Sequence, residues 1–198
     1  MPLPGEFHRT LSREEINALP IRRYEGEVRL VATARELERA MQAIRREALV
    51  GFDTETRPAF RAGQSYPPSL AQVAGAGAVY LLQLQRLDCA AALAGVLASP
   101  AIVKAGVGLA DDLLALRKLF EFEERAMVDL GAVARRHGLR RSGVRYLAAL
   151  FLGFRIPKKT KTSNWAAPRL SAQQVAYAAT DAWACRELCL RFRAMGLV

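Results

Sequence analysis

The chain has 198 residues, of which 52% are hydrophobic and 24% are charged, and its formal net charge is +10. These proportions are those of a globular domain that can bury a sizeable core, and they exclude a disordered or fibrous protein. The most apolar stretch, residues 89–103, is too short to span a bilayer, and residues 1–20 lack the pattern of a secretory signal, so we expect a cytoplasmic protein with no membrane partner.

The cysteines are odd in number and lack a paired C-x-x-C spacing, which argues against a disulfide framework or a zinc site. Cys185 and Cys189 are four residues apart on a predicted helix. We therefore interpret them, with Cys89, as small buried apolar side chains.

Residues 1–25 are predicted to form an N-terminal arm that precedes one domain over residues 26–198. Within the arm, Ser12 and Glu15 have the spacing of a capping box, in which each side chain bonds a free N–H at a helix start. This spacing predicts a short helix over residues 13–19.

The domain begins with a predicted short strand within residues 24–31, where apolar and charged residues alternate. A second capping box, Thr33 with Glu36, predicts a helix that continues to about residue 46.

The next strand leads directly into two acidic residues. An apolar run over residues 49–52 is followed by Asp53 and Glu55, and Pro58 ends the segment. Alternate residues of a strand point the same way, so the two carboxylates are expected on one face. A divalent cation such as Mg²⁺ would relieve their repulsion. The alternative is a loop that carries two solvated acids.

A turn-rich loop over residues 59–69 is expected beside these carboxylates. Residues 70–74 and 78–84 flank two glycines and are predicted to form a hairpin. Together with the preceding strand they form an antiparallel meander, and a helix over residues 88–97 follows.

A second acidic site follows the predicted strand 101–107. Gly106 and Gly108 allow a close turn, after which Asp111 and Asp112 fall in the first turn of a helix. Successive helical residues diverge, so only one of the two acids is expected to take part. The alternative is that both acids only complement the helix dipole.

The remaining elements before the last helix are predicted over residues 110–120 (helix), 127–130 (strand), 129–137 and 144–152 (helices).

The last helix is predicted to begin after Ser171, which forms a third capping box with Gln174, and to end near residue 193. Tyr177 and Asp181 lie on one face, one turn apart. A tyrosine so placed can hold a water near a metal, or it can simply bond a buried acid. The alternation of strands and helices predicts an α/β fold with a mixed sheet flanked by helices.

The positive charge is concentrated in one segment. Residues 130–180 contain ten basic residues and no acidic one, which is a candidate footprint for a polyanion. Interleaved aromatic residues favour nucleic acid over a membrane surface. The residues that we expect to contact nucleic acid are Arg145, Lys158, Lys159, Lys161, Asn164 and Trp165. For Trp165, burial in the core is the interpretation that we favour over stacking on a base.

Taken together, the three acidic sites resemble the DEDDy family of 3′-5′ exonucleases, the DnaQ-like group that includes ribonuclease D and the Werner exonuclease domain. The resemblance covers residues 26–196. Val-Gly-Phe-Asp-Thr-Glu at 50–55 is similar to the first family motif, Lys-Ala-Gly-Val-Gly with Asp112 to the second, and Tyr-Ala-Ala-Thr-Asp at 177–181 to the third.

The resemblance implies a ribonuclease H-like fold with a mixed five-stranded sheet, and hydrolysis of terminal phosphodiester bonds that releases nucleoside 5′-monophosphates. It implies that Asp53, Glu55, Asp112 and Asp181 hold two Mg²⁺ or Mn²⁺ ions and that Tyr177 orients the attacking water. It also implies a contact from Glu55 to the 3′-terminal hydroxyl.

The expected partner is a single strand or a 3′ end of DNA or RNA. The sequence does not decide between DNA and RNA, or which oligomeric state the protein adopts. A catalytically silent nucleic-acid-binding module with the same fold is the alternative function, because a fold alone does not establish an activity.

Overall fold

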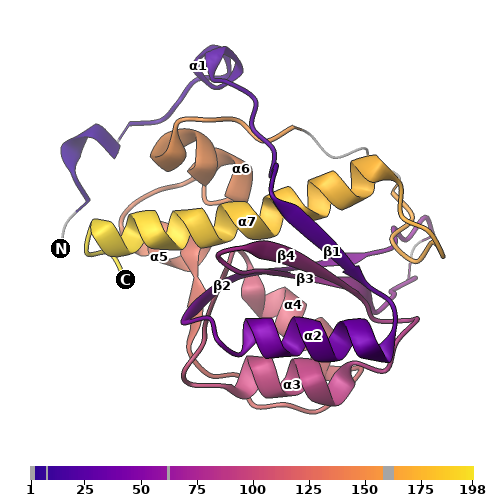
Figure 1. The fold of residues 1–198 in the computed structure, drawn as a ribbon. Helices are drawn as coiled ribbons and strands as arrows, with labels where there is room; N and C mark the ends of the chain where they lie inside the picture. The colour runs from indigo at the N-terminus through magenta and orange to yellow at the C-terminus, as the bar shows by residue number, and fades with distance from the viewer. Residues whose placement is uncertain (1–2, 8, 62, 158–162) are drawn as a thin grey trace.

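A computed structural model describes residues 3–7, 9–61, 63–157 and 163–198. The chain forms a mixed sheet with helices on both faces (Figure 1). The strands are β1 (Glu27–Val31), β2 (Leu49–Thr56), β3 (Pro68–Ala74), β4 (Ala78–Gln83), β5 (Val103–Gly106) and β6 (Met127–Asp129). The helices are α1 (Arg13–Ala18), α2 (Ala34–Ile44), α3 (Ala90–Ala98), α4 (Leu109–Arg117), α5 (Leu130–Arg136), α6 (Val144–Leu147) and α7 (Ala172–Ala194).

The sheet has the strand order β1-β4-β3-β2-β5-β6. Strands β2, β3 and β4 pair antiparallel, as the predicted meander requires, and the other pairs are parallel. The expectation of five strands is wrong, because the described sheet has six. Both edge strands are short and are paired, β1 with β4 and β6 with β5.

The two faces of the sheet are covered by different helices. Helices α2, α3 and α4 pack on one face, where Val50 and Phe52 of β2 are fully buried. Helix α7 lies across the other face (Figure 1). It packs there through Ala178, Ala179 and Ala182, whose small side chains allow a close approach.

All three predicted capping boxes are present, at Ser12, Thr33 and Ser171. The local rule identifies these helix starts because each side chain bonds a neighbouring N–H within the same turn. The predicted helix over residues 144–152 differs in its second half, which is a π-helical turn, η2 (Ala148–Leu152).

The described part of the N-terminal arm packs onto the domain. Its first turn, η1 (Gly5–Phe7), places the Phe7 ring 4.7 Å from the ring of Phe151, measured between centroids. The backbone N–H of Leu11 donates to the Tyr146 hydroxyl at 3.2 Å. Ile21 forms a bridge with Arg155. The arm is thereby held beside α6 and η2.

All three cysteines are buried and unpaired, as predicted. Across the described residues, the helices are all too short or too polar to cross a bilayer.

Candidate active site

Three carboxylates from two elements meet where β2 crosses under α7. Asp53 and Glu55 occupy alternate positions of β2 on the face that α7 covers, and Asp181 lies on α7 itself. One carboxylate oxygen from each lies within 4.8 Å of the other two. Glu55 is 7% exposed and Asp181 is 4% exposed, so water screens their charges poorly.

The charges in this cluster oppose one another. Burial raises the pKa of Asp53 well above its usual range, and the neighbouring charges of Asp181, Asp112 and Glu55 raise it further. A cluster of buried like charges is stable at neutral pH only if protons or a cation neutralise it. Carboxylate oxygens are the ligands that Mg²⁺ and Mn²⁺ prefer, so this donor set fits a hard divalent cation.

Asp112 lies outside the three-carboxylate cluster but next to it. The Thr54 hydroxyl of β2 donates a hydrogen bond to the Asp112 carboxylate. Burial raises the pKa of Asp112 to about 6, and the Asp111 and Asp129 charges add to the shift. Asp111 itself is exposed. The structure therefore turns Asp112, and not Asp111, toward β2.

The position of Asp112 depends on the tight turn between β5 and α4. Gly108 has a φ of 77°, which favours glycine. At Gly106, an added Cβ would lie 2.6 Å from the Phe52 carbonyl oxygen. The Asp129 carboxylate accepts hydrogen bonds from the N–H groups of Gly108 and Ala132, at 3.3 and 3.0 Å, and so ties this turn to the start of α5. We had not identified Asp129 from the sequence, because this role depends on a contact between separate elements.

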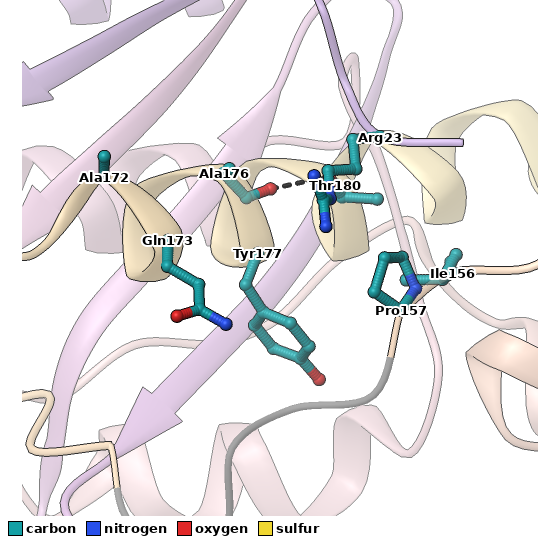
Figure 2. A pocket seen from close by; sticks show the side chains of 8 residues that line it. All are labelled: Arg23, Ile156, Pro157, Ala172, Gln173, Ala176, Tyr177 and Thr180. Atoms are coloured by element: carbon teal, nitrogen blue, oxygen red, sulfur yellow. Dashed lines mark hydrogen bonds between the residues drawn. The ribbon is translucent and has the colours of Figure 1, made fainter. Parts of the chain in front are cut away.

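Tyr177 lies one turn before Asp181 on α7. Burial, followed by the charge of Asp181 and a hydrogen bond to it, raises the pKa of the Tyr177 hydroxyl far above its usual range. The phenol therefore keeps its proton at any physiological pH. In Figure 2 its ring projects from α7 with Gln173 on one side and Pro157 on the other.

The residues expected to contact nucleic acid differ in their surroundings. Lys158, Lys159 and Lys161 lie outside the described residues. Arg145 Nε donates to the carbonyl oxygen of Ile156 at 3.2 Å. Asn164 is exposed, and its side-chain oxygen accepts from the N–H of Ala166. Trp165 is 2% exposed and packs against α7, which agrees with the core interpretation.

Gln72 is a further polar residue beside the acids that we had not identified from the sequence. It pairs with Asp53 across β2 and β3, and directly opposed residues of an antiparallel pair share a face. Its side chain is fully buried, and neither amide atom has a hydrogen-bond partner among the described residues. A buried unpaired amide is costly, so a role at this position is expected. The only sequence signal was a polar residue within an otherwise apolar strand.

The family described as 3′-5′ exonuclease matches residues 28–196. The exonuclease mut-7 homolog of Homo sapiens is 31% identical over 222 aligned positions, which cover 94% of this chain and 25% of that protein. Ribonuclease D of Gluconacetobacter diazotrophicus is 32% identical over 156 positions, which cover 77% of this chain and 39% of that protein.

Among solved structures, the EXO domain of Aedes aegypti Nibbler matches with a TM-score of 0.77 and 23% identity, over 90% of this chain and 94% of that one. This likeness confirms the predicted ribonuclease H-like α/β fold. The chain spans less than half the length of the two curated relatives.

Proposed function

Because this chain belongs to the family of 3′-5′ exonuclease domains, we propose that it is a metal-dependent hydrolase that removes nucleoside 5′-monophosphates from the 3′ end of a nucleic acid strand. The observation that carries the proposal is the meeting of Asp53, Glu55 and Asp181 within 4.8 Å, with Tyr177 one helical turn away.

In this proposal Asp53, Glu55, Asp112 and Asp181 hold two Mg²⁺ or Mn²⁺ ions. Bound in such a site, paired divalent cations stabilise the attacking and leaving oxygens of a phosphoryl transfer. Burial of Glu55 and Asp181 limits the screening of their charges by bulk water and so strengthens their hold on cations. Thr54 fixes the Asp112 carboxylate by its hydrogen bond.

Tyr177 is proposed to position the attacking water. Its hydroxyl hydrogen is directed to Asp181, which leaves the oxygen able to accept a hydrogen bond from water. Water then adds to phosphorus and the bond from phosphorus to the 3′ oxygen of the preceding nucleotide breaks. The water oxygen stays on the released 5′-monophosphate, and a proton ends on the 3′ oxygen, which becomes the new 3′ hydroxyl of the shortened strand. Glu55, the second acid of β2, is proposed to contact the terminal 3′ hydroxyl, which would select strand ends.

RNA is the substrate that we favour. The match to ribonuclease D supports RNA, since that relative is named for it. The proposed contacts are to phosphate and to a terminal hydroxyl, which DNA also carries, so we expect DNA to be cleaved as well, though less efficiently.

Asparagine variants of the acids test the proposed metal ligands. We expect Asp53→Asn and Asp181→Asn to lower cleavage by more than about 100-fold, since even the loss of an outer partner of a metal ligand costs 10–100-fold. Mn²⁺ should raise the melting temperature of the parent protein and not of these variants. Asp111→Asn, which alters an exposed acid on the same helix as Asp112, is the matched control. Full activity of Asp181→Asn would contradict the assignment.

Tyr177→Phe tests the role of the phenol separately from metal binding. We expect the rate of cleavage to fall by about 100-fold, the cost of misplacing a reacting group by about 1 Å, while Mn²⁺ still stabilises the protein. Tyr80→Phe removes a hydroxyl from a buried tyrosine of β4 and is the control. Unchanged turnover by Tyr177→Phe would remove the tyrosine from the mechanism.

A further inference from the structure

A cleft of about 910 Å³ separates the N-terminal arm from the start of α6. The arm contributes residues of α1 and the segment that follows it, and the opposite wall consists of residues 141–146 and 155–157. Four arginines line it: Arg13, Arg141, Arg145 and Arg155. Among the described residues that line it, none is acidic. We call this feature the arginine cleft.

Three of the four guanidinium groups are held in place by backbone carbonyls. Arg145 Nε donates to Ile156 and Arg155 Nε donates to Leu19, each at 3.2 Å. Arg141 Nη1 donates to Leu11 at 3.3 Å, and its guanidinium carbon lies 4.3 Å from the centroid of the Tyr146 ring. A guanidinium has five N–H donors, so each retains donors for a ligand.

The positive charge of the cleft is not balanced by the protein. Within the described ranges, the ion pairs involve other arginines. Neither acid of α1, Glu14 or Glu15, lines the cleft, and Glu15 bonds Arg9 and the N–H of Ser12 instead. Four nearby cations without carboxylates repel one another, so an anion would stabilise the arrangement.

The arginine cleft adjoins a pocket that reaches Tyr177 of the candidate active site. A second pocket of about 390 Å³ reaches Tyr177 and is lined by Arg23 and Gln173 (Figure 2). Ile156 and Pro157 line both hollows, so the two adjoin. A strand whose 3′ end lies at Tyr177 therefore has a route past Arg23 to the arginines.

The cleft also offers apolar surface. Ile16, Val144 and Ile21 line it, and Ile21 is 53% exposed. Phosphates beside arginine and bases against apolar side chains are the contacts that a single strand makes without sequence preference. A polyanion with no apolar part would leave this surface in water.

We propose that the arginine cleft binds the phosphodiester backbone of the substrate strand on the 5′ side of the bond that is cut. The proposal rests on the proposed function, since it takes the 3′ end to lie at Tyr177. It assigns a role to the N-terminal arm, which closes one wall of the cleft. A dinucleotide has a single phosphodiester, which in this proposal lies at the acids and leaves no phosphate for the cleft, whereas a longer strand places upstream phosphates there.

The test compares a dinucleotide with a single strand of about 15 nucleotides, a length within known single-strand site sizes. In Arg13→Gln/Arg155→Gln, the ratio of kcat/KM for the long strand to that for the dinucleotide should fall at least about 10-fold, as expected for two charged hydrogen bonds. The matched control is Arg35→Gln/Arg39→Gln, which neutralises two exposed arginines of α2 on the other face of the sheet.

Arg155 also holds the arm, so a structural effect must be separated from a charge effect. Arg13→Lys/Arg155→Lys retains the charges and should restore most of the ratio. The slope of log affinity against log salt concentration should become shallower by about 1.4 in the glutamine pair, at about 0.7 for each contact to a single strand. Equal losses in the lysine and glutamine pairs, or an unchanged slope, would overturn the proposal.

Fluorescence anisotropy with the intact strand and Ca²⁺ measures binding without turnover. If the parent protein cleaves neither substrate with any metal but binds the strand through the arginines, the proposed function is contradicted and the proposed binding role of the cleft is supported. If both substrates are cleaved and Arg13→Gln/Arg155→Gln leaves the ratio of their kcat/KM values unchanged, only the proposed role of the cleft is contradicted. If anionic phospholipid vesicles displace the labelled strand from these arginines and unlabelled strand does not, the cleft binds a lipid surface. This result would also overturn the proposal.

Discussion

Gln72 lies directly across from Asp53 and combines complete burial with an amide that is unpaired among the described residues. Leucine has a similar volume and no polar atoms. We therefore expect Gln72→Leu to raise the free energy of unfolding by about 1 kcal/mol, since it removes an unsatisfied buried group. The same change should lower kcat, because it removes an amide that lies beside Asp53 and whose atoms are available to bond water or substrate in the site. A substitution that raises the free energy of unfolding and lowers kcat is typical of a functional position.

The control is Gln83→Leu on β4, where the buried side-chain oxygen also lacks a partner among the described residues. It should raise stability in the same way and leave kcat unchanged. Thermal unfolding and single-turnover cleavage measure the two quantities. If Gln72→Leu cleaves at the parental rate, Gln72 has only a packing role.

Lys104 of β5 is a fully buried cation whose Nζ donates to the carbonyl oxygen of Ser99, at the end of α3, at 2.6 Å. Burial lowers the pKa of Lys104 from 10.5 to about 8. The unfolded chain retains the higher pKa, so between these values it binds more protons than the folded protein. The free energy of unfolding should therefore rise with pH in this window, with a slope of up to about 1.4 kcal/mol per pH unit from this residue.

Lys104→Met removes the titrating group and should lack this component of the rise. Urea unfolding of both proteins between about pH 8 and pH 10 isolates it, since the other titrating groups are common to both. Parallel profiles for the two proteins would show that burial does not shift this pKa.

Strand β2 and helix α7 must approach closely for their acids to meet. A Cβ added at Gly51 would lie 1.9 Å from the carbonyl oxygen of Ala182 and 2.8 Å from the Arg186 nitrogen, and both are backbone atoms. Gly51→Ala must therefore push α7 away from the sheet, and Asp181 and Tyr177 move with it. We expect a loss of about 1–3 kcal/mol in the free energy of unfolding and a fall in cleavage of about 100-fold, the known cost of a displacement of about 1 Å.

Gly95→Ala is the matched control, because an added Cβ in this helix meets no atom within 4 Å. It should stabilise the protein by about 0.5–1 kcal/mol and leave cleavage unchanged. An active and stable Gly51→Ala protein would mean that the contact between β2 and α7 does not position the acids.

The elements that could be predicted from the sequence are those with local causes. Strand alternation indicated that Asp53 and Glu55 share a face, and helical spacing placed Tyr177 one turn from Asp181. Each capping box marked a helix start. Each of the six strands was predicted along the chain, β6 among them as residues 127–130, and only the count of five, which the resemblance implied, was wrong.

The residues that escaped prediction act through contacts between distant segments. Gln72 is recognisable only once β3 pairs with β2 in register. Asp129 matters because it bonds the turn at Gly108. The arginine cleft requires the arm to dock, which depends on Phe7 stacking on Phe151. A run of basic residues was visible in the sequence, but which arginines share a wall was not.

The whole molecule combines two charge patterns. Buried acids lie where β2 meets α7, while the arginines lie beyond Tyr177 between the arm and α6. The acids require cations, and the arginines require an anion. The substrate that we propose would satisfy both, since the 3′-terminal phosphodiester of a nucleic acid strand would lie among metal-bound acids and its upstream phosphates among the arginines. This placement of the strand is the one that cleavage from the 3′ end requires.

The direction of digestion tests this placement most directly. A single strand of RNA labelled at its 5′ end is incubated with the protein and Mg²⁺ or Mn²⁺, and the products are separated by length. We predict a descending ladder in which every product keeps the label, and no ladder when a chelator is added. Release of the label as a mononucleotide from the start, or an intact strand with every metal, would contradict 3′-5′ hydrolysis at this site.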